Sequence, residues 1–273
     1  MSATTALDHS GPSPVLDVSG TPGVPFTRLV GVELRKMADT RAGRWLLIAI
    51  GALTALVMVI MVWVGLAQDL RIGFRDFMIG MNMPMGVLLP VLGVMSVTSE
   101  WGQRTALVTF TQVASRTRVI AAKFAGTLLI AIVAVVLGVA LASLATVVFA
   151  NLADIDAVWG LGAADVAKFF LLHVIGMATG FALGMLLLNS AAAIVVYFVY
   201  TFVLPGLFAV GAALIGWFGD LQPWIDFGSA QTPLTTGEAI TGDQWSHLVV
   251  SGLIWLVLPF VVGLWRVLRA EVK

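Results

Sequence analysis

Long apolar runs follow one another along most of this chain. Six of them reach about twenty residues, at approximately 45–67, 77–97, 119–150, 166–188, 191–217 and 248–268. A helix that rises 1.5 Å per residue needs about twenty residues to cross a hydrocarbon core roughly 30 Å thick. The runs are continuously apolar and do not alternate, which favours helices over barrel strands, and a helix satisfies its own backbone groups in lipid. The pattern predicts six transmembrane helices.

Short local motifs predict a break and a kink in the later spans. The stretch 166–217 is too long for one helix, and the short polar turn Asn189-Ser190 is where we divide it. Within the fifth span, Pro205-Gly206 predicts a kink, because proline removes a helical hydrogen bond. The segment 219–245 is long for a loop. We expect it to fold back as short helices that cap the outer mouth of the bundle.

Composition agrees with a membrane location. The chain is 59% hydrophobic and 11% charged, with a mean hydropathy of +1.00, against roughly 45–50% and about 25% in typical soluble proteins. We therefore expect an all-α integral membrane protein, a single multi-pass domain over 26–273 in the cell membrane. The chain has no cysteine, which excludes disulfides and thiolate metal sites. No residue pattern suggests a metal site or a nucleic-acid partner.

The basic residues predict the orientation. Twelve of the fifteen fall on one side if the spans are as given, and that side also holds both termini: Arg28, Arg35, Lys36, Arg41, Arg44, Arg104, Arg116, Arg118, Lys123, Arg266, Arg269 and Lys273. Only Arg71, Arg75 and Lys168 fall on the other side, together with most of the acidic residues. Because short cytoplasmic loops are enriched in Lys and Arg, both termini are expected in the cytoplasm.

The region before the first span divides into two parts. Residues 1–25 contain four prolines and no Lys or Arg, which is typical of a disordered tail. Residues 26–40 place apolar side chains on one helix face at spacings of three and four, and Arg28, Arg35 and Lys36 on the other. Glu33 is a further charged residue of this segment. This pattern predicts an amphipathic helix in the headgroup plane. A plain juxtamembrane basic segment that only sets the topology is the alternative.

The segment 98–118 is the longest internal loop on the cytoplasmic side. Glu100 and Arg104 are spaced as a favourable acid-first i,i+4 pair. Leu107, Phe110 and Val113 form an apolar stripe between charged ends, which suits a modest interface with a soluble protein. The segment is rich in Thr and Val, which lowers its helix propensity. A solvated loop whose arginines serve only topology is the alternative interpretation.

The spans offer no obvious source of energy for transport. Deep within the predicted spans the polar groups are His173, Asn82 and hydroxyls, and no Asp, Glu, Lys or Arg lies away from the span ends. Ion-driven carriers generally use an intramembrane ionisable group, and a lone His173 more often bonds to a neighbouring helix than relays protons. The chain also contains no phosphate-binding GxxxxGK[ST] motif. If transport is driven by ATP, the ATPase must be a separate chain.

Two features inside the spans suggest how helices pack or guide a substrate. The second span carries several methionines, two prolines and one amide, and we consider Met81, Asn82 and Met85 as the wall of a substrate path. Ordinary packing or lipid-facing methionines are the alternative. The glycine stripe of the fourth span, Gly176, Gly180 and Gly184, predicts close helix packing. We favour packing inside the protomer over a dimer face.

Several of these residues resemble one known family. An amphipathic helix, two spans and then "EWGQRTALVTFTQVASRTRVIAAK" resemble the permease subunits of ABC-2 type transporters, the type V exporter group. The matching positions are Glu100, Trp101, Thr105, Arg116, Arg118, Ala121, Ala122 and Lys123. Arg104 stands where that family usually has Gly, and the proline that commonly precedes the basic pair is absent. The resemblance extends over about 26–268.

The resemblance implies a half-transporter that pairs with a second permease copy or a paralogue in the lipid bilayer. It implies that the loop between the second and third spans is a coupling helix for a separate ABC ATPase subunit, with ATP and Mg bound by that subunit and no cofactor on this chain. The coupling residues would be Glu100, Trp101, Arg104, Thr105, Phe110, Arg116, Arg118 and Lys123. A membrane enzyme or its anchor, a structural or immunity-type protein, and an importer permease are the alternatives.

Overall fold

The computed structural model describes residues 23–102 and 115–269, and every regular element in that part of the chain is helical. The helices are α1 (Phe26–Asp39), α2 (Arg41–Ala67), α3 (Phe74–Gly102), α5 (Arg116–Leu152), α6 (Ala163–Leu187), α7 (Ser190–Phe198), α8 (Leu204–Leu214), α9 (Gly216–Ile225), α10 (Phe227–Ala230), α11 (Gly242–Gly252) and α12 (Leu258–Arg269). Short π-helical segments at Val199–Val203 and Leu253–Val257 join α7 to α8 and α11 to α12, and a 3-10 turn covers Thr232–Leu234.

Six helical segments are long and apolar enough to span a membrane, which confirms the predicted number. Four are the single helices α2, α3, α5 and α6, and the other two are the composite helices 190–214 and 242–269. Most begin or end several residues beyond the apolar runs, because polar residues continue the helices outside the apolar stretch. The largest is α5, whose 37 residues correspond to about 55 Å of helix.

The predicted break between the fourth and fifth spans is confirmed. Leu188 follows α6 with a left-handed backbone (φ 51°), a conformation that ends a helix and that L-residues seldom adopt. Asn189 then caps α7, because its Oδ1 accepts a hydrogen bond from the Ala192 N–H at 3.0 Å. The polar turn therefore contains both the end of one span and the start of the next.

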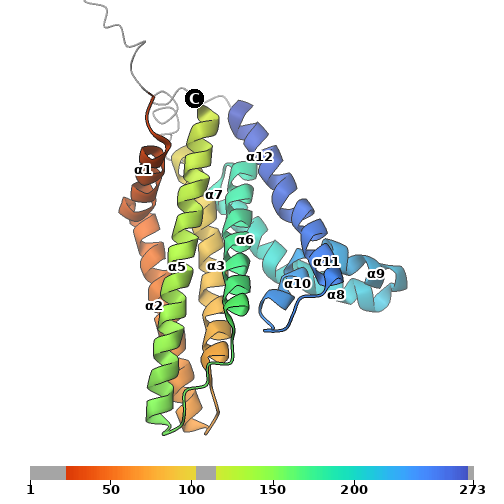
Figure 1. The fold of residues 1–273 in the computed structure, drawn as a ribbon. Helices are drawn as coiled ribbons and strands as arrows, with labels where there is room; N and C mark the ends of the chain where they lie inside the picture. Colours follow the sequence, from red (N-terminus) through yellow and green to blue (C-terminus); the bar gives the residue numbers. More distant parts are fainter. Residues whose placement is uncertain (1–22, 103–114, 270–273) are drawn as a thin grey trace, which may run out of the picture.

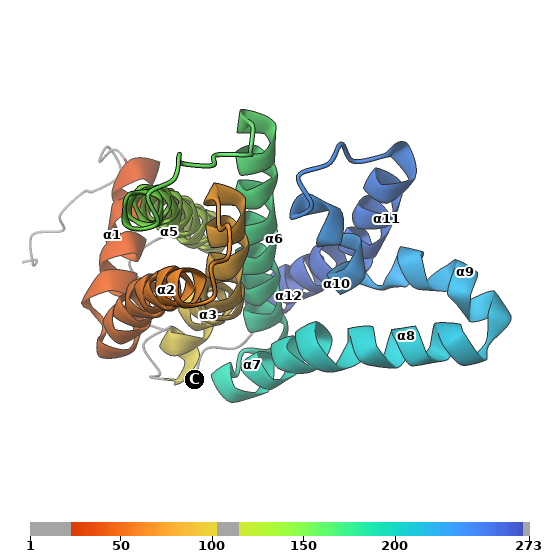
Figure 2. The same cartoon turned by 90° about the horizontal axis from the view of Figure 1, so that it is seen from below.

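The helices form a bundle and an arm. Figure 1 shows α2, α3, α5 and α6 side by side, with α1 above α2, and Figure 2, the view from below, shows α7 and α8 extending away from that bundle and α9 and α10 returning towards it. We call the returning segment, residues 215–241, the arm. Helix α3 packs on α2, α5 and α6 and so lies at the centre of the bundle. Helix α12 packs along α6, and the described ends of α1 and α12 lie at the same end of the molecule (Figure 1).

The glycine stripe of α6 packs against α3 within the protomer, as predicted. A Cβ atom on Gly180 would lie 2.1 Å from the carbonyl oxygen of Pro90, and one on Gly184 would lie 2.9 Å from that of Val94. In the opposite direction, a Cβ on Gly93 of α3 would lie 2.5 Å from the Met177 carbonyl oxygen. The two backbones approach so closely because each helix places small residues opposite the other.

The fifth span is irregular close to the predicted kink. The π-helical segment Val199–Val203 ends two residues before Pro205, which lies in the first turn of α8. Because proline lacks an N–H, the carbonyl of Thr201 receives no helical bond from it, and the extra residue of a π turn accommodates this loss. Beyond α8 the segment 219–245 includes short helices, as predicted, and a role as a cap of the outer mouth stays a prediction.

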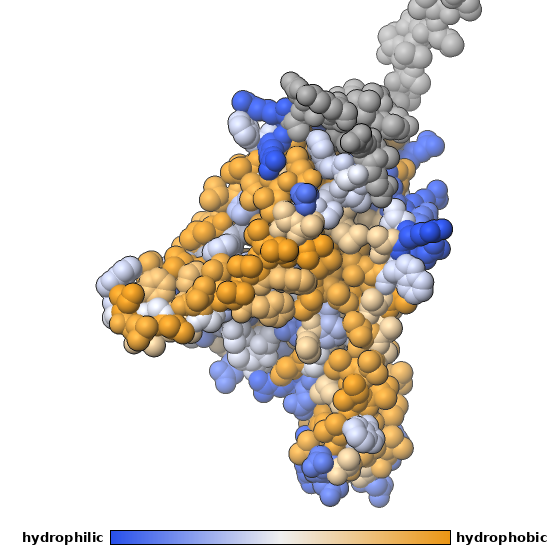
Figure 3. Space-filling model, turned by 180° about the vertical axis from the view of Figure 1, so that it is seen from behind, coloured by the Kyte–Doolittle hydropathy of each residue, from blue (hydrophilic) through white to orange (hydrophobic). Residues whose placement is uncertain are grey.

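The surface has the pattern expected of a multi-pass membrane protein. On the face that Figure 3 shows, an apolar band crosses the middle of the molecule, including the projection formed by α8 and α9, and hydrophilic residues gather towards the two ends. Large apolar side chains that face outward include Trp63, Leu137, Phe202 and Leu214. Such exposure over several helices would be unusual for a soluble protein, and lipid accounts for it.

Candidate functional site

Four charged side chains from three helices meet at the end of the bundle where α1 lies. Lys36 Nζ is 2.8 Å from Glu33 Oε1 and 2.8 Å from Glu100 Oε1. Lys123 Nζ is 2.5 Å from Glu33 Oε2 and 3.1 Å from Glu100 Oε1. Each carboxylate therefore contacts both ammonium groups, and the four residues form a closed ring of alternating charge. We call Glu33, Lys36, Glu100 and Lys123 the ion ring.

The ion ring is largely shielded from solvent. The side chains of Glu33 and Lys123 are only 6% and 8% exposed, Glu100 is 12% exposed, and Lys36 is the most accessible at 36%. Buried charges are stable only when they are paired and hydrogen-bonded. Here two negative and two positive groups neutralise one another. Burial alone would lower the pKa of Lys36, but its hydrogen bonds to Glu100 and Glu33 and their charges outweigh it and raise that pKa.

Local sequence explains how the three helices bring these groups together. In α1, Glu33 and Met37 are four residues apart and are the two buried residues of the helix. Lys36 lies in the last turn of α1, where a cation is favoured by the helix dipole. Helix α3 continues past the apolar run as far as Gly102 and so carries Glu100 to this level.

The four predicted residues of the N-terminal helix divide into two groups. Glu33 and Lys36 belong to the ion ring, whereas Arg35 is exposed. Arg28 lines a cavity of about 1000 Å³ beside the ring, between α1, the start of α2, the end of α3 and the start of α5. Whether α1 lies in the headgroup plane stays a prediction, but its buried face packs on α5 and α2.

The predicted coupling residues occupy different environments. Trp101 is half-buried against an apolar cluster that includes Ile120 and Met185. Arg116 Nη1 donates to the carbonyl oxygen of Leu268 at 3.3 Å, which ties α5 to α12. Arg118 is exposed. Glu100 and Lys123 lie in the ion ring.

Three of the predicted coupling residues, Arg104, Thr105 and Phe110, lie outside the described residues. The expected pair of Glu100 with Arg104 therefore stays a prediction. Glu100 already has two cationic partners, Lys36 and Lys123.

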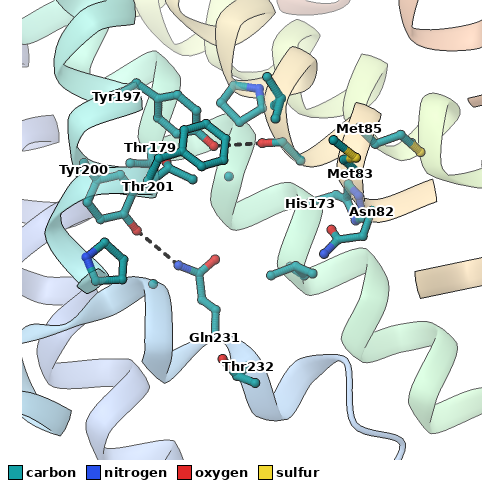
Figure 4. Close-up of a pocket in the computed structure, with 18 of the residues that line it drawn as sticks. Asn82, Met83, Met85, His173, Thr179, Tyr197, Tyr200, Thr201, Gln231 and Thr232 are labelled. Carbon is teal, nitrogen blue, oxygen red and sulfur yellow. Dashed lines mark hydrogen bonds between the residues drawn. The ribbon is translucent and has the colours of Figure 1, made fainter. Parts of the chain in front are cut away.

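A second cavity, of about 470 Å³, lies between the spans and the arm. Figure 4 shows Asn82, Met83 and Met85 of α3 with His173 of α6, facing Tyr197, Tyr200 and Thr201 of the fifth span, with Gln231 and Thr232 of the arm nearby. No Asp, Glu, Lys or Arg of the described chain lines it. We call it the neutral cavity.

Two tyrosines fix the wall of the neutral cavity. The Tyr197 hydroxyl donates to the Gly86 carbonyl oxygen at 2.8 Å. This carbonyl lies four residues before Pro90, which has no N–H to bond it within the helix, so the tyrosine satisfies an acceptor that the proline leaves free. Gln231 Nε2 donates to the Tyr200 hydroxyl at 3.2 Å (Figure 4).

The predicted substrate-path residues fall only partly in this cavity. Asn82 and Met85 line it, but Met81 does not. Met81 is fully buried against α5, where a Cβ on Gly138 would lie 2.8 Å from its sulfur. The cavity also includes the two tyrosines, Gln231 and His173, which the sequence did not assign to a common site. These residues come from several spans and from the arm, and the periodicity of the sequence does not specify how those elements lie relative to one another.

Comparison with known proteins adds no family assignment. No protein-family model matches the chain, and no curated protein matches it. Among the described residues no group of three or more His, Cys, Asp or Glu side chains could hold a metal ion. The ion ring and the neutral cavity are the two candidate functional sites of the described residues.

Proposed function

We propose that this chain is the membrane-spanning permease subunit of an ATP-driven ABC exporter. In this proposal the chain forms the substrate path, and a separate ATPase subunit binds the segment between α3 and α5. The ion ring is the observation that carries the proposal. Glu100 lies just before that segment, Lys123 lies just after it, and both contact Glu33 or Lys36 of α1.

The ion ring offers a physical route for coupling. It joins the end of α3, the start of α5 and the end of α1 at one level through short, shielded ionic contacts. A force applied to the intervening segment by a partner would therefore act on three helices together. Rigid elements joined by packed contacts can transmit such a displacement, and a change between inward and outward states requires a helix movement of this kind.

The resemblance to ABC-2 type permeases and the lack of a phosphate-binding loop support a separate ATPase, which would hold ATP and Mg. We propose that the ion-ring end faces the cytoplasm, because most of the basic residues lie at that end. A second copy of this chain or a paralogue would complete the transporter, as the resemblance implies.

Charge reversal of Arg118 tests the docking part of the proposal. Arg118 is exposed, whereas Arg116 also bonds to Leu268 and would disturb the fold when changed. We expect Arg118→Glu to reduce co-purification of a co-expressed ABC ATPase and the dependence of its ATP hydrolysis on this chain. Arg71→Glu is the matched control, because Arg71 is exposed at the opposite end.

Two results would count against the exporter proposal. One is unchanged ATPase binding and hydrolysis in Arg118→Glu, which would show that the surface around Arg118 does not bind the ATPase. The other is the absence of any ATPase stimulation by the wild-type chain in a membrane. That result would favour a non-transport membrane protein, which is the main alternative from the sequence.

A further inference from the structure

His173 lines the neutral cavity, and its ring nitrogen Nε2, which neighbouring side chains cover, has no hydrogen-bond partner among the described residues. Its Nδ1 lies 2.9 Å from the Phe169 carbonyl oxygen. A carbonyl can only accept, so Nδ1 carries the proton and Nε2 of the neutral ring is an acceptor. His173 is 2% exposed, and its buried Nε2 has no hydrogen-bond partner among the described residues. Such a group is costly to bury unless a donor reaches it.

The remaining lining of the cavity specifies what kind of donor could enter. Amide and hydroxyl groups come from Asn82, Thr179 and Gln231, and apolar surface comes from Met85 and Leu172. Because no charged side chain of the described residues lines the cavity, a charged ligand would be buried without a counter-ion, which is strongly unfavourable. The cavity volume of about 470 Å³ lies within the range of small-molecule sites, roughly 300–1,000 Å³.

We propose that the neutral cavity binds an uncharged amphiphile that carries a hydroxyl or N–H donor. The donor bonds to His173 Nε2, and the apolar body of the ligand lies against Met85, Pro90 and Leu172. The amide of Asn82, on the adjoining wall in Figure 4, is available for a second polar group of the ligand. This inference goes beyond the exporter proposal and would survive its failure, because it concerns binding and not ATP-driven movement.

Position in the fold supports a ligand that enters from the bilayer. The cavity is bounded by three spans and by the short segments Phe227–Ala230 and Thr232–Leu234 of the arm. Some of its lining residues, such as Met83 and Phe202, are also exposed on the apolar surface of the molecule. A lipid-soluble molecule could therefore enter the cavity between the spans without crossing a charged surface, and the side chains that cover His173 Nε2 would move aside as its donor bonds.

A photoreactive alcohol tests the proposal. The probe is a dodecanol that carries a diazirine, used on the purified protein in nanodiscs, with labelled residues located by mass spectrometry. We expect labels on α3, α6 and the fifth span around the cavity. Unlabelled dodecanol should compete about tenfold better than its methyl ether at matched membrane concentrations, because the ether lacks the donor for Nε2.

Variants separate the histidine from the cavity as a whole. His173→Phe keeps a planar ring and removes the acceptor, and it should lower labelling about tenfold, whereas His173→Gln restores a side-chain acceptor and should recover part of it. His247→Phe is the matched control, because His247 packs on Trp224 outside the cavity.

Three outcomes overturn the inference. They are labels that fall outside the cavity, equal competition by the ether, and undiminished labelling of a folded His173→Phe protein. If His173→Phe does not fold, the alcohol and ether competition on the wild-type protein still decides the question.

Discussion

The ion ring and the neutral cavity share helix α3 but use polar groups in opposite ways. In the ion ring, near the C-terminal end of α3, each charged group contacts two of opposite sign. In the cavity, along the middle of the same helix, no charged group of the described chain lines the wall, and His173 Nε2 is unpaired. Closed networks hold helices in fixed positions, whereas an open acceptor can select a ligand.

The difference suggests a division of labour along α3. The ion ring fixes the position of α3 relative to α1 and α5, and the cavity lies between α3, α6 and the fifth span. Glycine contacts between α6 and α3 connect the two regions. Substitutions in the ion ring, at the glycine contact between α6 and α3, and in the cavity wall should therefore lower the free energy of unfolding by progressively smaller amounts.

The largest effect is expected from opening the ion ring. Lys123→Met removes its most buried cation and leaves Glu33 and Glu100 with only Lys36. Breaking a buried pair in this way typically costs about 3–5 kcal/mol of unfolding free energy. Lys168→Met is the control, because Lys168 pairs with a single carboxylate, Asp165, at the opposite end and donates one further hydrogen bond to the Glu238 carbonyl oxygen. Its loss of unfolding free energy should be smaller, because no second carboxylate loses its partner, and thermal unfolding in detergent would compare the two.

A second substitution should distinguish charge from packing in the ring. Glu33→Gln in the Lys123→Met background removes the uncompensated carboxylate, so part of the lost stability should return. Additive losses in this double-mutant cycle, or equal losses for the two lysine variants, would show that the four groups do not act as a ring.

A smaller effect is expected at the contact between α6 and α3. Gly180→Ala places a Cβ 2.1 Å from the Pro90 carbonyl oxygen, so the helices must separate, and such overpacking costs about 1–3 kcal/mol. Gly51→Ala is the control, because nothing lies within 4 Å of its Cβ position. It should be neutral or slightly stabilising in unfolding experiments. An equally stable Gly180→Ala protein would contradict close packing in this region.

The smallest effect is expected from the cavity wall. Tyr197→Phe removes the hydrogen bond to the Gly86 carbonyl oxygen and should cost about 1 kcal/mol. In the Pro90→Ala background the backbone gains an N–H at position 90 that can bond this carbonyl within the helix, so the same tyrosine substitution should cost less. Equal losses in the two backgrounds, measured by unfolding, would show that the tyrosine does not compensate for the proline.

Most of the helical architecture was predictable, because lipid requires long uninterrupted apolar helices. The break at Asn189 was visible as two polar residues within an apolar stretch, and the glycine spacing of α6 indicated a packing face. The arm was predictable only as short helices. Its position beside the cavity depends on tertiary contacts, such as the hydrogen bond from the Trp255 indole to the Ile225 carbonyl, that local patterns do not encode.

The sequence identified many residues of the candidate sites, but it did not predict which of them lie together. Glu33, Lys36, Glu100 and Lys123 were each selected from the sequence, but for separate roles. Their meeting depends on how α1 packs against α3 and α5, which periodicity does not specify. His173 was interpreted as a histidine that bonds to a neighbouring helix; it is buried, but its bond is to Phe169 of its own helix, so the predicted partner was wrong. That its second nitrogen, Nε2, could accept a hydrogen bond from a ligand follows only from the position of His173 at the cavity, which the sequence does not specify.

The orientation of the ion ring in the membrane is the central claim, and labelling of single cysteines tests it most directly. The chain has no native cysteine, so Thr117→Cys at the ion-ring end and Gln68→Cys at the opposite end each provide one site, and both positions are exposed. A membrane-impermeant maleimide applied to intact cells should label Gln68→Cys, and it should label Thr117→Cys only after permeabilisation. The reverse pattern would place the ion ring outside the cell and contradict the proposed coupling to ATP.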